Sequence, residues 1–271
     1  MSSRFLRVSA FPVFIALSGP GCDRTPVGPP PALAESARMD SLRVAAAPAP
    51  AGFGGIRGRV VFRGTPPAPK AMNVTLDGHV CGTEAKISEA LVVSPDGGVA
   101  NAVVWVAGVD PGPMPVPAAP PKVIQKACVF SPHVVLVPQG GSIWLYNEDG
   151  VAHNFNARGK GANSMNFNQP PMGPAGEVAN TVSFPDSGVV TYECSFHYWM
   201  TGCVYAAPHR LHVLTGPDGS FVLENVPAGQ RRIKVWHEPV GDLKLVLPET
   251  EIPVPAGGEM GVELPISVET K

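Results

Sequence analysis

Three side chains that can donate to a metal ion lie close together in the stretch YECSFHYWMTG, residues 192–202. Cys194, His197 and Met200 follow one another with two residues between each, in the pattern Cys-x2-His-x2-Met. Each of them alone has an ordinary explanation as a buried or packed side chain. Together, a thiolate, an imidazole and a thioether form a soft, mixed donor set, and such sets suit copper.

A mononuclear type 1 copper site needs a second histidine, because it holds the metal with two His and one Cys in a plane and with a weak axial Met. The loop supplies one histidine, so the other must come from a different strand. His153, in IWLYNEDGVAHNFN, follows the end of an expected strand. The sequence therefore predicts one copper ion with the ligands His153, Cys194, His197 and Met200.

The elements that must position these ligands are expected to be β-strands. The chain of 271 residues contains 30 Gly and 32 Pro, which helices tolerate poorly, and no useful helical period occurs. In GVVTYECSFH, Val190, Tyr192 and Cys194 fall on one face of a strand. Further strands are expected in 55–64 and 99–108, and the Gly140–Gly141 turn predicts a hairpin in 133–150.

The stretches YNEDGVAHN and FPDSGVVTYECSFHYWMTG, and their order, resemble the cupredoxins, most of all the amicyanins. The resemblance spans residues 130–205 and implies a plastocyanin-like Greek-key β-sandwich with a type 1 blue copper site. It implies the same four ligands, and it implies that Asn147 and Ser195 brace the ligand loops through hydrogen bonds. We expect His197, with Tyr198 and Trp199 beside it, to form an exposed electron port.

A second resemblance lies outside this stretch. HVLTGPDGSFVLENVPAGQRRIKVWHE, residues 212–238, is similar to carboxypeptidase regulatory-like (transthyretin- or Cna-B-like) sandwiches, and GIRGRVVFRG at 55–64 is similar to their first strand. We infer that the copper domain is inserted into this sandwich, and three successive small β units are the alternative. The layout also resembles bacterial proteins labelled methylamine-utilisation proteins. The fold class is therefore expected to be all-β.

The N-terminus predicts export. MSSRFLRVSA carries two arginines and a short apolar run follows it, which is typical of a signal peptide. Cys22 resembles the lipidated cysteine of bacterial lipoproteins, although Gly19 replaces the usual Leu; lipidation and export without a lipid both stay open. The expected organisation is as follows: a signal peptide (1–21), a Pro/Ala-rich tether (22–54), a first part of the β-sandwich (55–109), a Pro-rich loop (110–121), the cupredoxin domain (122–207) and a second part of the β-sandwich (208–271).

The number of cysteines, five, limits the role that each of them can have. Cys22 belongs to the processing site and Cys194 to the metal, which leaves an odd number. Cys81 and Cys128 each flank an expected strand, so we predict that they form a disulfide and that Cys203 stays a buried thiol. His133, His209, His212 and His237 are expected to be structural or interfacial.

The donor set favours an electron carrier over an enzyme, because four protein ligands leave no position for a substrate. Such a carrier would work in the periplasm or cell envelope, contact a redox protein transiently, and touch a membrane only through an N-terminal lipid. A net charge of −2 and the lack of a Lys/Arg cluster argue against nucleic acid. The alternatives are a copper-binding or copper-delivery lipoprotein, and an envelope-binding β-sandwich module with an incidental copper site.

Overall fold

A computed structural model describes residues 52–172 and 180–269. The expected signal peptide, Cys22 and nearly all of the expected tether lie outside these residues. Almost all regular secondary structure of the described residues is β-strand, with one turn of α-helix, α1 (Gly78–Cys81), and a short 3₁₀ helix, η2 (Gly161–Asn163). The all-β prediction is confirmed. Within the described residues, no helix is long and apolar enough to cross a membrane.

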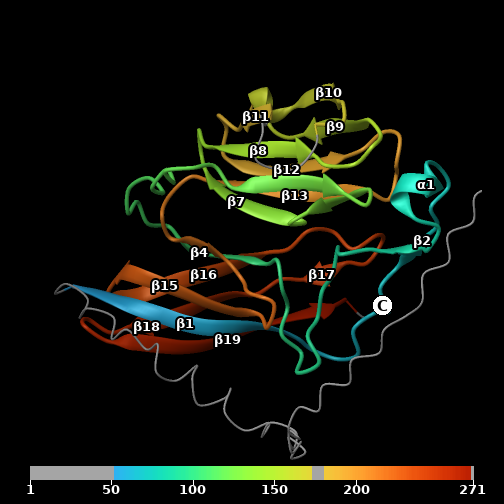
Figure 1. The fold of residues 1–271 in the computed structure, drawn as a ribbon. Coiled ribbons are helices and arrows are strands. Elements are labelled where there is room, and N and C mark those ends of the chain that lie inside the picture. The colour runs from blue at the N-terminus through green and yellow to red at the C-terminus, as the bar shows by residue number, and fades with distance from the viewer. Residues whose placement is uncertain (1–51, 173–179, 270–271) are drawn as a thin grey trace, which may run out of the picture. The chain divides into compact units, whose positions relative to one another are not determined.

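The strands between residues 122 and 207 form two facing sheets, here called the first sandwich (Figure 1). One sheet has the order β10 (Met165–Gln169), β9 (His153–Arg158), β12 (Gly188–Glu193), β13 (Thr201–Ala207) and β7 (Val134–Pro138). The other has the order β11 (Asn180–Ser183), β8 (Ser142–Asn147), β5 (Lys122–Lys126) and β6 (Val129–Ser131). Leu145 of β8 and Phe155 and Tyr192 of the opposite sheet belong to one buried core between them.

The alternation expected for β12 is present. Val190 and Tyr192 are buried and Thr191 between them is exposed, so the strand presents one face to the core and the other to solvent. Cys194, directly after the strand, keeps this period and is buried as well. β12 pairs antiparallel with β9, so the end of β12 lies beside the start of β9. Cys194 therefore lies next to the first residues of β9.

The hairpin predicted at Gly140–Gly141 is wrong. β7 pairs with β13 in one sheet, whereas β8 pairs with β5 and β11 in the other. The turn itself exists, because the N–H of Gly141 donates to the carbonyl of Pro138 at 2.8 Å. It carries the chain across the core from one sheet to the other, since both strands already have partners elsewhere.

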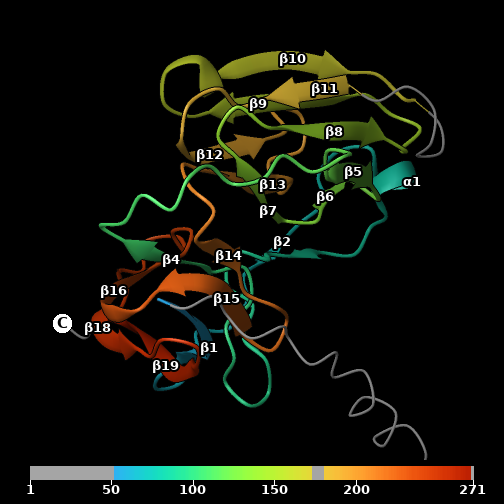
Figure 2. The same ribbon diagram turned by 90° about the vertical axis from the view of Figure 1, so that its left-hand side faces the viewer.

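The remaining long strands form the second sandwich, with a core of its own (Figure 2). One sheet has the order β15 (Ser220–Pro227), β1 (Phe53–Phe62), β19 (Glu259–Val268) and β17 (Leu245–Val246). The other has the order β14 (His212–Leu214), β4 (Val103–Ala107), β16 (Gly229–Trp236) and β18 (Glu249–Val254). Strands that precede the first sandwich in the chain therefore pair with strands that follow it: β1 with β15 and β19, and β4 with β14 and β16.

Residues 71–87, here called the covering segment, differ from the expected plan. The sequence predicts that they belong to the second sandwich with the rest of 55–109. They contain β2 (Ala71–Met72), α1 and β3 (Lys86–Ile87). Cys81 belongs to the core of the first sandwich, and Met72, Val74 and Val80 pack against that core. The covering segment therefore packs on the first sandwich through buried Cys81 and three partly buried apolar side chains.

Candidate metal centre

The expected ligands come from adjacent strand ends. His153 is the first residue of β9, Cys194 follows the last residue of β12, and these two strands pair antiparallel. The loop after Cys194 folds back on itself, because the N–H of Cys194 donates to the carbonyl of Met200 at 3.0 Å. The N–H of Met200 in turn donates to the carbonyl of His197 at 2.8 Å. This short loop brings His197 back beside Cys194.

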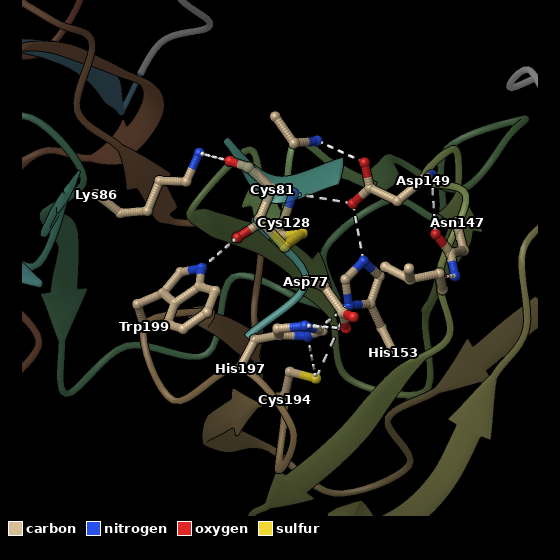
Figure 3. The surroundings of a disulfide bond; sticks show 12 residues. Asp77, Cys81, Lys86, Cys128, Asn147, Asp149, His153, Cys194, His197 and Trp199 are labelled. Carbon is tan, nitrogen blue, oxygen red and sulfur yellow. Dashed lines mark hydrogen bonds and ion pairs between the residues drawn. A yellow bond between two sulfur atoms is a disulfide. The ribbon is translucent and has the colours of Figure 1, made fainter. Parts of the chain in front are cut away.

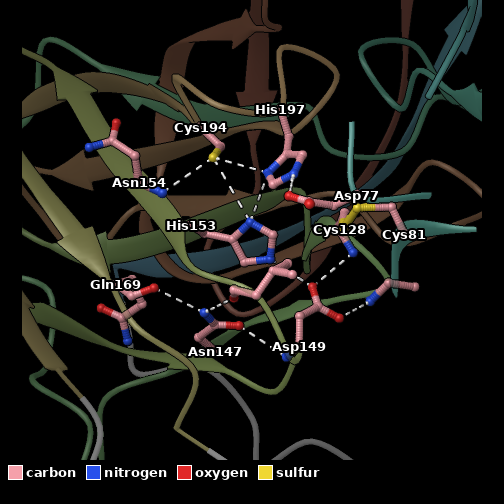
Figure 4. A network of polar contacts seen from close by, with 12 residues as sticks. Asp77, Cys81, Cys128, Asn147, Asp149, His153, Asn154, Gln169, Cys194 and His197 are labelled. Atoms are coloured by element: carbon pink, nitrogen blue, oxygen red, sulfur yellow. Dashed lines mark hydrogen bonds and ion pairs between the residues drawn. A yellow bond between two sulfur atoms is a disulfide. The ribbon is translucent and has the colours of Figure 1, made fainter. Parts of the chain in front are cut away.

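Three donor atoms converge in the resulting space (Figure 4). The Nδ1 atoms of His153 and His197 are 3.1 Å apart. The Sγ of Cys194 lies 3.9 Å from Nδ1 of His153 and 3.6 Å from Nδ1 of His197. All three side chains are buried.

These separations fit a metal ion at the middle of the three atoms. Protein nitrogen and sulfur ligands bind a metal such as zinc at about 2.0–2.3 Å, so donors spread around one ion lie about 3–4 Å from one another. The two Nδ1 atoms and the Sγ atom satisfy this spacing. Two imidazoles and one thiolate form the donor set of a trigonal copper site.

The second nitrogen of each histidine contacts a carboxylate. Nε2 of His153 lies 2.8 Å from Oδ2 of Asp149, and Nε2 of His197 lies 3.0 Å from Oδ2 of Asp77. A carboxylate accepts the Nε2–H of a neutral imidazole, which leaves the Nδ1 lone pair free for a metal. The two carboxylates therefore assign the same tautomer to both rings, with Nδ1 toward the shared space.

Asp149 is itself held in place. Its carboxylate accepts the backbone N–H of Ala127 at 2.6 Å and of Cys128 at 2.9 Å, and its own N–H donates to Oδ1 of Asn147 at 3.0 Å. Burial raises the pKa of Asp149, but hydrogen bonds from His153 and from the two backbone N–H groups outweigh burial and leave the pKa below its usual range. The group therefore stays an ionised acceptor for His153 at neutral pH.

Cys194 is poised to be a thiolate. Burial raises the pKa of its thiol, but the polar contact with the His153 ring and hydrogen bonds from backbone N–H groups outweigh burial and lower the pKa to about 6. One of these donors is the N–H of Asn154, 3.2 Å from Sγ. The thiolate is the form that binds metals, so the lowered pKa favours coordination by Cys194 at neutral pH.

The expected bracing residues lie around the donors. The Asn147 amide donates to the carbonyl of Val151 at 2.9 Å and of Gln169 at 3.0 Å, which ties together the chain on either side of His153. The Ser195 hydroxyl donates to Oδ1 of Asn154 at 2.8 Å. Both side chains thus connect the segments that carry ligands.

Met200 is placed beside the donors by the backbone and is fully buried, in the core cluster that also holds Cys194 and Trp199. Its carbonyl accepts the N–H of Cys194. These contacts fix the end of the ligand loop. The role of the Met200 thioether as axial ligand stays a prediction.

The electron port expected at His197 needs correction. His197 is fully buried. Trp199 is 3% exposed, because its indole packs inward and its N–H donates to the carbonyl of Cys128 at 3.0 Å. Tyr198 is 55% exposed and its hydroxyl donates to the carbonyl of Asn73 in the covering segment. Phe196, not singled out from the sequence, is 46% exposed. The exposed aromatic side chains of the loop are therefore those on either side of the histidine.

The disulfide and the buried Cys203 thiol that the sequence predicts are both present. A disulfide joins Cys81 in α1 to Cys128, between β5 and β6 (Figure 3). Cys194 and Cys203 are free and buried. Burial, and then the nearby Glu238 carboxylate, raise the pKa of the Cys203 thiol, so this residue stays a neutral thiol.

The four other histidines expected to be structural take part in packing and hydrogen bonds. His133 pairs with Glu238, His212 stacks on Trp105, His237 contacts the carbonyl of Glu238, and His209 accepts the N–H of Leu211. Among the described residues, the groups spaced to hold a metal include none of these four.

Sequence reasoning missed Asp77, Asp149 and Asn154. Asp149 lies four residues before His153, and a search for an acceptor for the second ring nitrogen would have found it. Asp77 is 120 residues from His197 in the chain, and no local pattern links the two.

Part of the chain is similar to solved structures of copper proteins. No family model and no curated protein match the chain. Among solved structures, a purple cupredoxin from Nitrosopumilus maritimus is 26% identical, covers 32% of this chain and 99% of its own, with a TM-score of 0.25. Amicyanin from Paracoccus versutus is 22% identical over 38% of this chain and 97% of its own, with a TM-score of 0.28. A copper-containing nitrite reductase from Thermus scotoductus is 23% identical over 37% of this chain and 27% of its own, with a TM-score of 0.27.

Proposed function

We propose that the protein binds one copper ion through His153, Cys194 and His197, with Met200 as axial ligand, and that it works as an electron carrier. The observation that carries this proposal is the convergence of two Nδ1 atoms and one Sγ atom at 3.1–3.9 Å. Copper in such a set alternates between Cu(II) and Cu(I) and so carries one electron.

The surrounding residues suit this task. Asp77 and Asp149 hold the two imidazoles, and the Asn154 N–H holds the thiolate, before any metal arrives. Donors fixed in this way move little when one electron is gained or lost. Four protein ligands leave no open position for a substrate, so we propose no catalytic activity.

The burial of the donors favours a carrier over a copper-delivery protein. All three donor side chains are almost inaccessible to solvent, whereas a delivery site must exchange its ion with a partner. We propose instead a transient contact with a redox protein. The exposed side chains of Phe196 and Tyr198 would form this contact, because they are the sequence neighbours of the copper ligand His197. The disulfide Cys81–Cys128 supports an oxidising compartment such as the periplasm, with or without a lipid at Cys22.

Visible absorption and electron paramagnetic resonance of the copper-loaded protein test this proposal. We expect an intense blue colour from Cys194-to-copper charge transfer, lost in Cys194→Ser and retained in Cys203→Ser, which removes the second free thiol among the described residues. A colourless wild-type protein that binds Cu(II) with ordinary tetragonal spectra would overturn the assignment. Equal loss of colour in both variants would show that the effect is not specific to the ligand cysteine.

A further inference from the structure

Asp77 reaches the metal centre from a part of the chain remote from the ligands. It lies in the covering segment, and its Oδ2 is 3.0 Å from Nε2 of His197 (Figure 4). His197 is fully buried, whereas the Asp77 side chain is 29% exposed. The carboxylate therefore stands between the buried imidazole and solvent.

The local backbone directs this carboxylate to the histidine. Asp77 immediately precedes α1 in a left-handed conformation, with φ 53° and ψ 35°. An aspartate in this position commonly caps the helix with its side chain, but here it makes no such bond. Instead, its backbone carbonyl accepts the N–H groups of Val80 and Cys81, at 2.9 and 2.8 Å. The side chain is left free to hold His197.

Two independent contacts hold the covering segment in place. The disulfide joins Cys81, the last residue of α1, to Cys128, whose N–H donates to the Asp149 carboxylate (Figure 3). The Tyr198 hydroxyl donates to the carbonyl of Asn73 at 2.9 Å. The same disulfide thus connects the segment that bears Asp77 with the turn that positions Asp149.

We propose that Asp77 is a positioning residue that sets the copper affinity and the reduction potential of this centre. The inference rests on the proposed function. By accepting the Nε2–H, Asp77 keeps the Nδ1 lone pair of His197 directed at the shared space. Its negative charge adds to that of Asp149, which holds the other histidine, and stabilises the more highly charged Cu(II) relative to Cu(I). The covering segment is therefore part of the metal centre rather than a cover alone.

Two substitutions at Asp77 separate these effects without changing the backbone. Asp77→Asn removes the charge and keeps an acceptor, and Asn tolerates the left-handed conformation. Asp77→Gly removes both charge and acceptor, and Gly adopts that conformation freely. Glu84→Gln is the matched control, because it removes a carboxylate from an exposed position in the same segment.

The readouts are Cu(II) affinity by chelator competition, the reduction potential, and the imidazole ¹⁵N shifts of His197 in the metal-free protein. We expect Asp77→Gly to lose about 10–100-fold in Cu(II) affinity, the usual effect of removing such a partner. Each tenfold preferential loss of Cu(II) over Cu(I) raises the potential by about 59 mV. Asp77→Asn should fall between wild type and Asp77→Gly, and Glu84→Gln should match wild type.

Failure of this inference is distinguishable from failure of the proposed function. A blue Asp77→Gly protein with wild-type affinity and potential would overturn the role of Asp77 and leave the copper site standing. A colourless wild-type protein would remove the proposed function. The ¹⁵N shifts, measured without metal, would still show whether Asp77 fixes the tautomer of His197, and unchanged shifts in Asp77→Gly would contradict it.

Discussion

At the residue scale, the metal centre depends on which nitrogen of each histidine faces the thiolate. An imidazole offers two nitrogens, and the partner of one decides the use of the other. Asp149 and Asp77 take Nε2 of His153 and His197, so both rings present Nδ1 to Cys194. The two carboxylates thereby fix the orientation of both imidazoles, and the N–H of Asn154 holds the Cys194 sulfur beside them.

Asp149→Asn tests this arrangement at His153. The amide still offers one oxygen, but it cannot accept from both His153 and the two backbone N–H groups that now share the carboxylate. We expect Cu(II) affinity to fall by about 10–100-fold. We also expect about 1–3 kcal/mol less unfolding free energy in the metal-free protein, because a buried donor loses its partner.

Chelator competition and urea unfolding measure the two effects. Asp242→Asn, at an exposed position in the second sandwich, is the control for loss of a charge. If Asp149→Asn bound copper as tightly as the control, the carboxylate would not position His153.

The sequence points to the side chains that converge in the candidate metal centre, but it does not point to the two carboxylates. The spacing of Cys194, His197 and Met200 in one loop is a local signal, and His153 follows a recognisable strand. The partner of His197 has no such signal, because Asp77 meets it only after the covering segment has packed on the first sandwich. Burial of His197 was missed for the same reason.

At the element scale, β12 positions Cys194, and β12 depends on its neighbour β13. Gly202 of β13 lies opposite Tyr192 of β12. A Cβ atom on Gly202 would lie 2.6 Å from the Tyr192 ring, which packs on Phe155 with ring centres 4.8 Å apart. The missing side chain makes room for the ring in the core, so the two strands fit together only with glycine here.

Gly202→Ala should therefore lower the unfolding free energy by about 1–3 kcal/mol, the usual effect of overpacking a core. Gly261→Ala in β19 is the matched control, because a Cβ there meets nothing within 4 Å. Urea unfolding of the metal-free variants gives both values. Equal stability of the two variants would show that the Tyr192 ring moves aside without cost.

Local periodicity predicts a strand, but it does not say which sheet the strand joins. The alternation of Val190 and Tyr192 identified β12, whose burial follows the expected pattern. The Gly140–Gly141 turn has the composition of a hairpin, yet it connects two sheets. Pairing is decided by the partners available across the whole sandwich, and a turn sequence does not contain that information.

At the scale of the whole molecule, a buried ion pair joins the two sandwiches. His133 lies just before β7 of the first sandwich, and it pairs with Glu238, which follows β16 of the second. Burial lowers the pKa of His133, but the hydrogen bond and charge of Glu238, with Glu89 adding to them, outweigh burial and leave the pKa raised. The nearby His237 has a pKa lowered by burial, so it does not compete as a cation.

This pair predicts a pH dependence of stability. The folded pKa of His133 lies above its unfolded value of about 6.5. Its contribution is therefore fully present below about pH 6.5 and is lost as the pH rises through the folded pKa. The difference in unfolding free energy between wild type and His133→Gln should shrink as the pH rises above neutral.

Urea unfolding across this pH range measures the difference, and His79→Gln, at an exposed histidine, is the control. A difference that stays constant or grows with rising pH would contradict a charged His133 in the folded protein.

X-ray absorption at the copper edge of the loaded protein gives the strongest test of the proposed copper centre, because it reports the atoms bound to the metal. We expect one short sulfur ligand and two imidazole nitrogens, at about 2.0–2.3 Å. In Cys194→Ser the short sulfur should disappear, and in Cys203→Ser it should remain. A first shell of nitrogen and oxygen alone in the wild-type protein would contradict a centre built from His153, Cys194 and His197.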